Sequence, residues 1–233
     1  MDISISGLQD LNAAIIDLDG TMVDTLGDFE VALNRMLADF QLPPVGRRFI
    51  EHTVGKGSEH LIRSTLDFVQ KAPKAGINRP CDAPESIAYE SAWDSYQRHY
   101  MAVNGQASEV YPGVHAGLQA LQRKGLRLAC LTNKPAAFAL PLLKAKCLDA
   151  YFQCVFGGDS FERKKPDPLP LLKTCQALGT APARTLMVGD SANDALAARA
   201  AGCPVILVTY GYNHGEPIRS VDADGFVDSL SRL

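Results

Sequence analysis

Two aspartates placed two residues apart, Asp17 and Asp19, give the clearest indication of chemistry in this sequence. They fall at the end of the run 13–18, where Asp17 is the only polar residue, a pattern typical of a strand buried on both faces of a parallel sheet. Both carboxylates would point the same way if the strand extends that far, and Gly20 lets the chain turn after them. Such a pair repels itself unless a cation lies between, which favours a hard divalent ion, Mg²⁺. An ordinary strand-ending Asp-Gly turn explains this stretch equally well.

Polar side chains follow three further strand-like segments, and this repetition is the main evidence for a site. In chain order these are Thr132 and Asn133, the pair Lys164 and Lys165, and the segment from Gly189 to Asp194. Taken singly, each has a plain explanation, because Thr, Asn, Asp and Ser cap helices and paired lysines are usually solvated. Parallel strands bring their carboxyl ends to one edge, so we expect all these groups to converge there.

The converging groups suit phosphoryl transfer. Asp17 is a carboxylate nucleophile able to attack phosphorus, and Asp19 is placed to protonate the leaving oxygen and later to deprotonate water. Mg²⁺ held by Asp17, Asp19 and Asp190 would reduce the repulsion between the Asp17 carboxylate and the anionic phosphate. Lys165 and Thr132 would neutralise the phosphoryl oxygens. Phosphoryl transfer depends largely on positioning and charge, so this set is close to complete.

Hydrophobic periodicity supplies the elements that must position these groups. From 24 to about 108 it predicts helices and no strand, whereas from 111 onward strands alternate with helices. Alternation implies right-handed crossovers and a parallel sheet covered on both faces. The fold class expected is therefore α/β, a Rossmann-like doubly wound parallel sheet, with residues 1–24 and 109–233 as the core domain and 25–108 as a helical domain inserted after the first strand. The expected elements are helices starting at Asp24–Thr25, near Leu61, at 84–101, 114–125, 135–146, 169–178 and 192–201, and strands at 126–131, 154–156, 185–188 and 205–208.

Composition narrows the function classes. The 233 residues carry a net charge of -3, with 46% hydrophobic and 21% charged residues, which is ordinary for a globular protein. This net charge does not indicate nucleic-acid binding, and no apolar run approaches the roughly 20 residues that span a bilayer. The first 12 residues lack Lys and Arg, so we expect no secretory signal. The six cysteines are scattered and favour free thiols in a reducing cytoplasm.

Four segments match, in order, the motifs of the haloacid dehalogenase-like hydrolase superfamily, which the chain resembles over nearly its whole length. They are residues 17–24 (Asp-Leu-Asp-Gly-Thr-Met-Val-Asp), Thr132-Asn133, Lys165-Pro166 and 189–194 (Gly-Asp-Ser-Ala-Asn-Asp). The resemblance implies a HAD-like core with a small α-helical cap, Asp17 as nucleophile and Asp19 as acid/base. It also implies that Asp19 binds Mg²⁺ through its backbone carbonyl, beside the side chains of Asp17 and Asp190.

The resemblance extends to residues around this set. We expect Gly20, Thr21 and Asn133 to contact the substrate, and Asp194 to support the metal ligands from the next turn of helix. Relatives often carry Asn between two cap glycines where this chain has Lys56. We hypothesise that Lys56 reaches a carboxylate at the far end of the substrate, with a solvated loop lysine as an equally weighted alternative.

Within the superfamily, three segments resemble the bacterial phosphoglycolate phosphatases. They are 157–159, 164–168 and 210–218 (Tyr-Gly-Tyr-Asn-His-Gly-Glu-Pro-Ile). This resemblance implies Mg²⁺-dependent hydrolysis of 2-phosphoglycolate, a small phosphate monoester, through an aspartyl-phosphate. His214 lies in the last segment and is expected to be structural.

Other functions stay open at this point. The same chemistry on a sugar phosphate is a close rival, and a phosphomutase would share core and cap but must exclude water from the phosphoenzyme. A haloacid dehalogenase is disfavoured because Asp19 has no use when the leaving group is a halide. A phospho-accepting signalling module, which is no enzyme, needs neither cap nor acid/base. We expect a monomer or homodimer.

Overall fold

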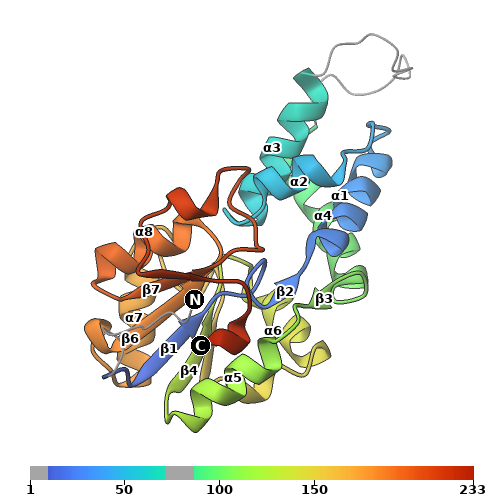
Figure 1. Ribbon diagram of the computed structural model, residues 1–233. Coiled ribbons are helices and arrows are strands. Elements are labelled where there is room, and N and C mark those ends of the chain that lie inside the picture. The colour runs from blue at the N-terminus through green and yellow to red at the C-terminus, as the bar shows by residue number, and fades with distance from the viewer. Residues whose placement is uncertain (1–9, 72–86) are drawn as a thin grey trace.

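A six-stranded, wholly parallel sheet forms the centre of the molecule (Figure 1). The computed structural model describes residues 10–71 and 87–233. The strand order is β5-β4-β1-β6-β7-β8. The strands are β1 (Ala13–Ile16), β4 (Arg127–Leu131), β5 (Cys154–Phe156), β6 (Thr185–Gly189), β7 (Val205–Val208) and β8 (Gly225–Val227). The doubly wound α/β class expected from the sequence is confirmed.

Strand β1 occupies the middle of this sheet because all four of its side chains are apolar and fully buried. Ile16 pairs with Cys130 of β4 on one side and with Val188 of β6 on the other. Its alternate side chains enter separate cores on the two faces of the sheet. The helices that cover those faces are α5 (Val114–Arg123) and α6 (Ala136–Ala145) on one, and α7 (Leu169–Leu178) and α8 (Ala192–Ala201) on the other.

Four helices between β1 and the rest of the sheet pack into a third core of their own. Figure 1 shows them at the upper right, beyond the carboxyl ends of the strands, and we call them the helical unit. Tyr96 and Tyr100 are fully buried at its centre, while Phe138 and Tyr212 join it from the sheet side. The helices are α1 (Leu26–Asp39), α2 (Arg47–Thr53), α3 (Ser58–Lys71) and α4 (Tyr89–Val103).

The chain crosses between sheet and helical unit twice, and the crossings pair with each other. Strand β2 (Val23–Asp24) is antiparallel to β3 (Glu109–Val110). The fully buried carboxylate of Asp28 braces the same junction by accepting from the backbone N–H groups of Gly105 and Ala107, both at 2.7 Å. The crossings coincide with the boundaries expected at 24 and 109, whereas the division into two domains stays a prediction.

Most expected elements are present, and the differences are local. Strand 154–156, helices 169–178 and 192–201 and strand 205–208 have the expected bounds. Helix α2 and the short strands β2, β3 and β8 were not expected. Strands β2 and β3 lie at the two ends of the region 24–108, and the described residues between them form helices and loops, as expected. Strand β1 ends at Ile16, before either aspartate, so the premise that Asp17 and Asp19 share a strand face was wrong. The irregular connection expected after Lys71 lies outside the described residues.

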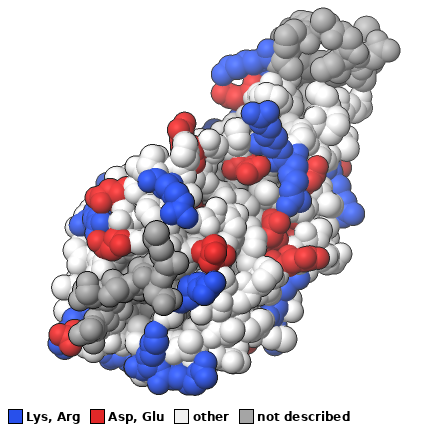
Figure 2. Space-filling view, viewed as in Figure 1, with Lys and Arg blue, Asp and Glu red and all other residues white. Residues whose placement is uncertain are grey.

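Charged residues of both signs lie on the visible surface (Figure 2), and the described cysteines form no disulfides. Acidic and basic side chains are interspersed on the face that Figure 2 shows. Within 10–71 and 87–233, no helix combines the length and apolar character needed to cross a membrane. The five cysteines in these ranges are free, as expected, and Cys81 lies outside them.

Candidate active site

A small cavity lies between the carboxyl ends of the strands and the helical unit. Its volume is about 30 Å³, which is room for one or two water molecules. The expected groups converge on it from four strand ends, while Val54, Gly55 and Ser58 line it from the helical unit. The core residues in its wall that were expected to form the site are Asp17, Asp19, Thr132, Asn133, Lys165, Asp190 and Asp194.

Asp17 is buried directly beyond the end of β1 and faces Lys165. The ammonium lies 2.9 Å from Asp17 Oδ1, but this contact lacks hydrogen-bond geometry, so Oδ1 is a buried acceptor without a hydrogen-bond donor. Lys165 Nζ instead donates to Leu131 O at 3.0 Å and to Asp194 Oδ1 at 2.7 Å. Burial raises the pKa of Asp17 to about 7, against the opposing effect of Lys165. Burial would lower the pKa of Lys165, but its two carboxylate neighbours outweigh this and raise it.

Asp190 is held by groups from two separate segments. Thr21 Oγ1 donates to its Oδ1 at 3.0 Å, and the backbone N–H of Tyr212 donates to its Oδ2 at 2.6 Å. Gly20, with φ +84°, passes so close that a Cβ there would lie 2.2 Å from Asp190 Oδ2. Burial, followed by the charges of Asp194 and Asp17, raises the pKa of Asp190 well above its ordinary range. Gly20 and Thr21 therefore position a carboxylate, and they are not in the cavity wall.

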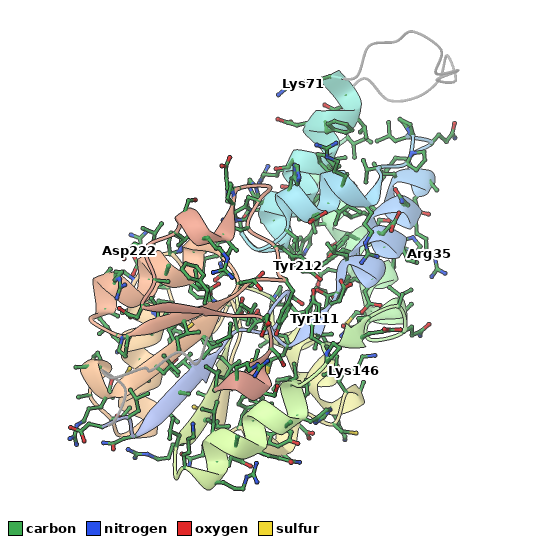
Figure 3. The ribbon with its side chains drawn as sticks, viewed as in Figure 1. Arg35, Lys71, Tyr111, Lys146, Tyr212 and Asp222 are labelled. Carbon is green, nitrogen blue, oxygen red and sulfur yellow. The ribbon has the colours of Figure 1, made fainter. Side chains whose placement is uncertain are left out.

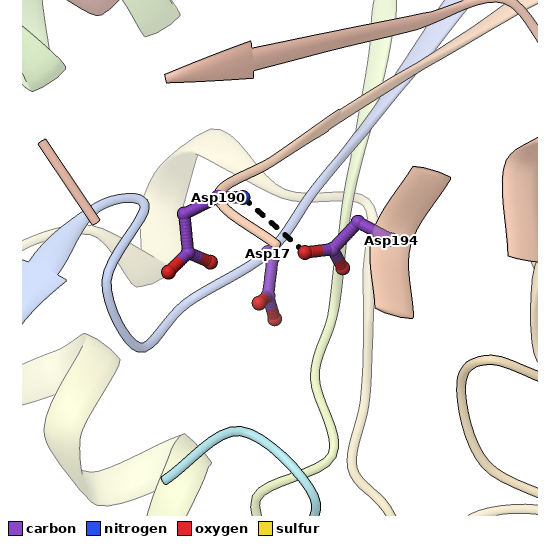
Figure 4. Close-up of side chains that lie close together, drawn as sticks. All are labelled: Asp17, Asp190 and Asp194. Atoms are coloured by element: carbon purple, nitrogen blue, oxygen red, sulfur yellow. Dashed lines mark hydrogen bonds between the residues drawn. The ribbon is translucent and has the colours of Figure 1, made fainter. Parts of the chain in front are cut away.

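Asp194 has its oxygens occupied by protein donors. It accepts from Lys165 on one oxygen and, on the other, from the Ser191 hydroxyl at 2.9 Å and from the backbone N–H groups of Asp190 and Ser191. These bonds form a capping box at the start of α8, so the capping alternative is confirmed here, while the role of Asp194 behind the metal ligands stays a prediction. Figure 4 shows its carboxylate beside those of Asp17 and Asp190.

These carboxylates fit a divalent cation. One ligand oxygen from each of Asp17, Asp190 and Asp194 lies within 4.8 Å of the others, and all three residues are buried. Asp17 Oδ1 lacks a hydrogen-bond donor and carboxylate oxygens are the ligands Mg²⁺ prefers. Asp194 accepts four hydrogen bonds, one of them from Lys165, whereas Asp190 accepts two, so Asp17 and Asp190 are the better side-chain ligands and Asp194 orients Lys165.

Asp19 has a lysine of its own. Lys134 Nζ donates to Asp19 Oδ1 at 2.8 Å and to Oδ2 at 3.1 Å, and its side chain is only 1% exposed. Asp17 and Asp19 are thus held in one cavity by different cations, Lys165 and Lys134. Two carboxylates with separate partners can perform separate tasks.

Thr132 and Asn133 organise the loop between β4 and α6. The Thr132 hydroxyl accepts from the backbone N–H of Lys134 at 3.1 Å. The Asn133 amide donates to Lys165 O at 2.8 Å and to Gly55 O at 3.1 Å, while its oxygen accepts from the backbone N–H of Lys165. Asn133 therefore aligns Lys165 and contacts the helical unit; its expected contact with substrate stays a prediction.

Lys56 and His214 lie outside this cavity wall. Lys56 is exposed in the loop between α2 and α3, and its role at the substrate stays a prediction. His214 packs near Gly55 and lies 3.4 Å from the Asn193 amide, while burial, then Lys56, lowers its pKa. Of the paired lysines, Lys164 is exposed and Lys165 is buried, so the solvated alternative is wrong for Lys165.

Sequence reasoning assigned no role to Lys134 or Tyr212. The Tyr212 hydroxyl donates to Asp24 Oδ1 and accepts from the backbone N–H of Thr25 at 3.0 Å, so one residue joins the crossing strands to Asp190. Figure 3 shows Tyr111 and Tyr212 together between the sheet and the helical unit. The signals were present, since Lys134 follows Thr132-Asn133 and Tyr212 lies in the 210–218 segment.

Comparison with known proteins agrees with this geometry. Residues 14–208 match the family model described as haloacid dehalogenase-like hydrolase. The chain belongs to this family. It is therefore an enzyme, a hydrolase, as the sequence predicted.

Its relatives carry a consistent description. A plasmid-encoded phosphoglycolate phosphatase from Cupriavidus necator is 44% identical over 221 residues, covering 95% of this chain and 90% of the relative. A phosphoglycolate phosphatase from Thiobacillus denitrificans is 41% identical, with coverage of 95% and 93%. The crystal structure described as a predicted phosphoglycolate phosphatase from Haemophilus somnus superposes with a TM-score of 0.87 at 32% identity, covering 96% of both chains.

The close approach of Gly20 to Asp190 makes the first prediction. Gly20→Ala places a methyl group on the carboxylate in a strained backbone region, so we expect the Mg²⁺ concentration for half-maximal activity to rise at least about tenfold. Gly46→Ala is the matched control, because nothing lies within 4 Å of its Cβ position. A metal titration of both variants checks this; equal Mg²⁺ requirements would contradict it.

The raised carboxyl pKa values make the second prediction. Without metal, folded Asp17 keeps its proton up to about pH 7, whereas the unfolded chain loses it near the ordinary 3.8, so stability falls as pH rises between those values. Mg²⁺ competes with this proton, and we expect it to raise the Tm more at about pH 8 than at about pH 5. Thermal unfolding with Mg²⁺ and with EDTA checks this. A shift independent of pH would contradict it.

Proposed function

We propose that this enzyme is a Mg²⁺-dependent phosphatase that hydrolyses 2-phosphoglycolate to glycolate and phosphate through an aspartyl-phosphate. The observation that carries the proposal is a pair of carboxylates with separate partners, buried Asp17 beside Lys165 and half-buried Asp19 bonded to Lys134. One carboxylate can then attack phosphorus while its neighbour handles protons. Bound at Asp17, Asp190 and the backbone carbonyl of Asp19, Mg²⁺ supplies positive charge that offsets repulsion between carboxylate and phosphate.

In the first half of the proposed reaction, an Asp17 oxygen bonds to phosphorus and the ester P–O bond breaks. Asp19 gives a proton to the leaving oxygen, which departs as the glycolate hydroxyl. Lys165 and the Thr132 hydroxyl lie in the same wall and face the charge on the phosphoryl oxygens. Lys165 is already fixed by Leu131 O and Asp194, so it needs no rearrangement to do so.

In the second half, Asp19 takes a proton from water, whose oxygen bonds to phosphorus as the bond to Asp17 breaks. Phosphate is released, Asp17 is again a carboxylate, and Asp19 is again protonated for the next cycle. The cavity holds only one or two water molecules, so substrate access requires the helical unit and sheet to separate. On closing, they exclude the bulk water that would screen these charges.

The choice of 2-phosphoglycolate rests on the relatives, which carry that description at 41–44% identity over 95% of this chain. The test is phosphate release from a panel of phosphate monoesters, with Mg²⁺ and with EDTA. We expect kcat/KM for 2-phosphoglycolate to exceed that for every sugar phosphate, and EDTA to abolish activity. Broad, weak, EDTA-sensitive activity would contradict the substrate but keep the chemistry; no release would favour the mutase or the signalling module.

Substitution of the two carboxylates tests their roles separately. Asp17→Asn removes the nucleophile and should abolish turnover, while Asp19→Asn should lower kcat about 10²–10⁴-fold, the usual contribution of general acid–base catalysis. Circular dichroism and the Tm, compared with wild type, control for folding. Either variant retaining near-wild-type kcat would refute its assignment.

A further inference from the structure

Lys134 is a buried cation whose position no expectation from the sequence explained. It follows β4 directly and lies where the sheet meets the helical unit, with only Asp19 as its ion-pair partner among the described residues. The rings of Phe29 in α1 and Tyr100 in α4 lie 4.5 and 4.8 Å from its Nζ. An ammonium has three N–H donors, and the two hydrogen bonds that Lys134 Nζ makes to described residues both go to Asp19.

Two phenol groups beside this pair also lack partners. Tyr96 and Tyr100 are fully buried on α4, and neither hydroxyl makes a hydrogen bond to a described residue. The Tyr100 ring, 4.8 Å from Lys134 Nζ, stacks on Tyr96 with ring centroids 5.5 Å apart, so both phenols lie on the helical-unit side of this pair, outside the cavity wall. Burial, and next the carboxylate of Asp19, raises the pKa of both. A buried donor left unpaired costs on the order of 1–3 kcal/mol, so these hydroxyls suit an acceptor that arrives with a ligand.

We propose that Lys134, with the hydroxyls of Tyr96 and Tyr100, binds a carboxylate on the carbon next to the scissile ester. The enzyme would thereby select phosphate esters of small 2-hydroxy acids. This inference rests on the proposed function, because it takes Asp19 as the group beside the leaving oxygen.

The covalent structure of such a substrate fits the position of Lys134. In 2-phosphoglycolate one methylene separates the ester oxygen from the carboxylate, so a group that binds the carboxylate must adjoin the one that protonates the ester oxygen. Lys134 Nζ lies 2.8 Å from Asp19 and meets this requirement. Lys165 already donates to Leu131 O and Asp194 on the metal side of the cavity, and Lys56 is exposed.

The balance of charge points the same way. The cavity wall contains Asp17, Asp19, Asp190 and Asp194 against Lys134 and Lys165. A divalent cation would neutralise this set, and the phosphoryl group then faces the metal side. With the wall neutral, the substrate's carboxylate adds a further negative charge and is stable only where a cation has a donor left to bind it. Lys134 is that cation on the side of the helical unit.

The test compares 2-phosphoglycolate with ethyl phosphate, in which a methyl group replaces the carboxylate. For Lys134→Met we expect the ratio of kcat/KM for 2-phosphoglycolate to that for ethyl phosphate to fall about 10- to 100-fold, the value of a charge-assisted contact. Any effect through Asp19 alone lowers both substrates equally and leaves the ratio unchanged, which would overturn the inference. Lys173→Met, at an exposed lysine of α7 outside the cavity wall, is the matched control and should keep the wild-type ratio.

Two conservative variants keep the proposal falsifiable if Lys134→Met fails to fold. Tyr96→Phe and Tyr100→Phe should each raise KM for 2-phosphoglycolate several-fold and leave kcat/KM for ethyl phosphate unchanged. Neither should lower the Tm of the free enzyme, because each removes an unpaired hydroxyl. A lower Tm, or equal losses on both substrates, would show an internal structural role and overturn the carboxylate site.

The wild-type enzyme separates this inference from the proposed function. If wild type shows no preference for 2-phosphoglycolate over ethyl phosphate, the proposed substrate is wrong and the inference with it. If wild type prefers 2-phosphoglycolate and Lys134→Met keeps that preference, the inference alone is wrong.

Discussion

Mutual repulsion among four carboxylates in one closed cavity is the constraint on which the rest of this structure depends. Burial raises the cost of each charge, and no residue can relieve it alone. The fold answers with separate cations for Asp17 and Asp19, and with hydroxyl and backbone donors for Asp190 and Asp194. One buried oxygen of Asp17 still lacks a hydrogen-bond donor, so a divalent cation bound at this oxygen would reduce the repulsion among the carboxylates most.

The parallel sheet makes this concentration of charge possible. Beyond Arg127 and Thr185 at their starts, the inner strands are apolar and buried, so polar residues follow where each strand ends, and every strand ends at the same edge. Glycines then allow an approach that a larger residue would block, as at Gly20 beside Asp190. The positions of the site residues therefore depend on where each strand ends and on glycines, such as Gly20, that allow close packing.

Much of this was predictable from the sequence, because local patterns carried it. The apolar strands and the helices α7 and α8 have strong periodicity and clear ends, and the polar residues beyond them mark the site. Helix α2 has seven residues and β2 only two, too little pattern to detect. The roles of Lys134 and Tyr212 depend on partners more than 100 positions away in the chain, which local reasoning does not reach.

The pairing of β2 with β3 has a mechanical consequence. Two independent tethers would let the helical unit slide, twist and tilt against the sheet, and each closure would have to find one arrangement among many. Because the two crossings are bonded to each other, they form a single strip that permits swinging and resists sliding. If the helical unit opens and closes as the proposed function requires, each closure would bring Tyr96, Tyr100 and Lys134 back into the same register with little loss of entropy.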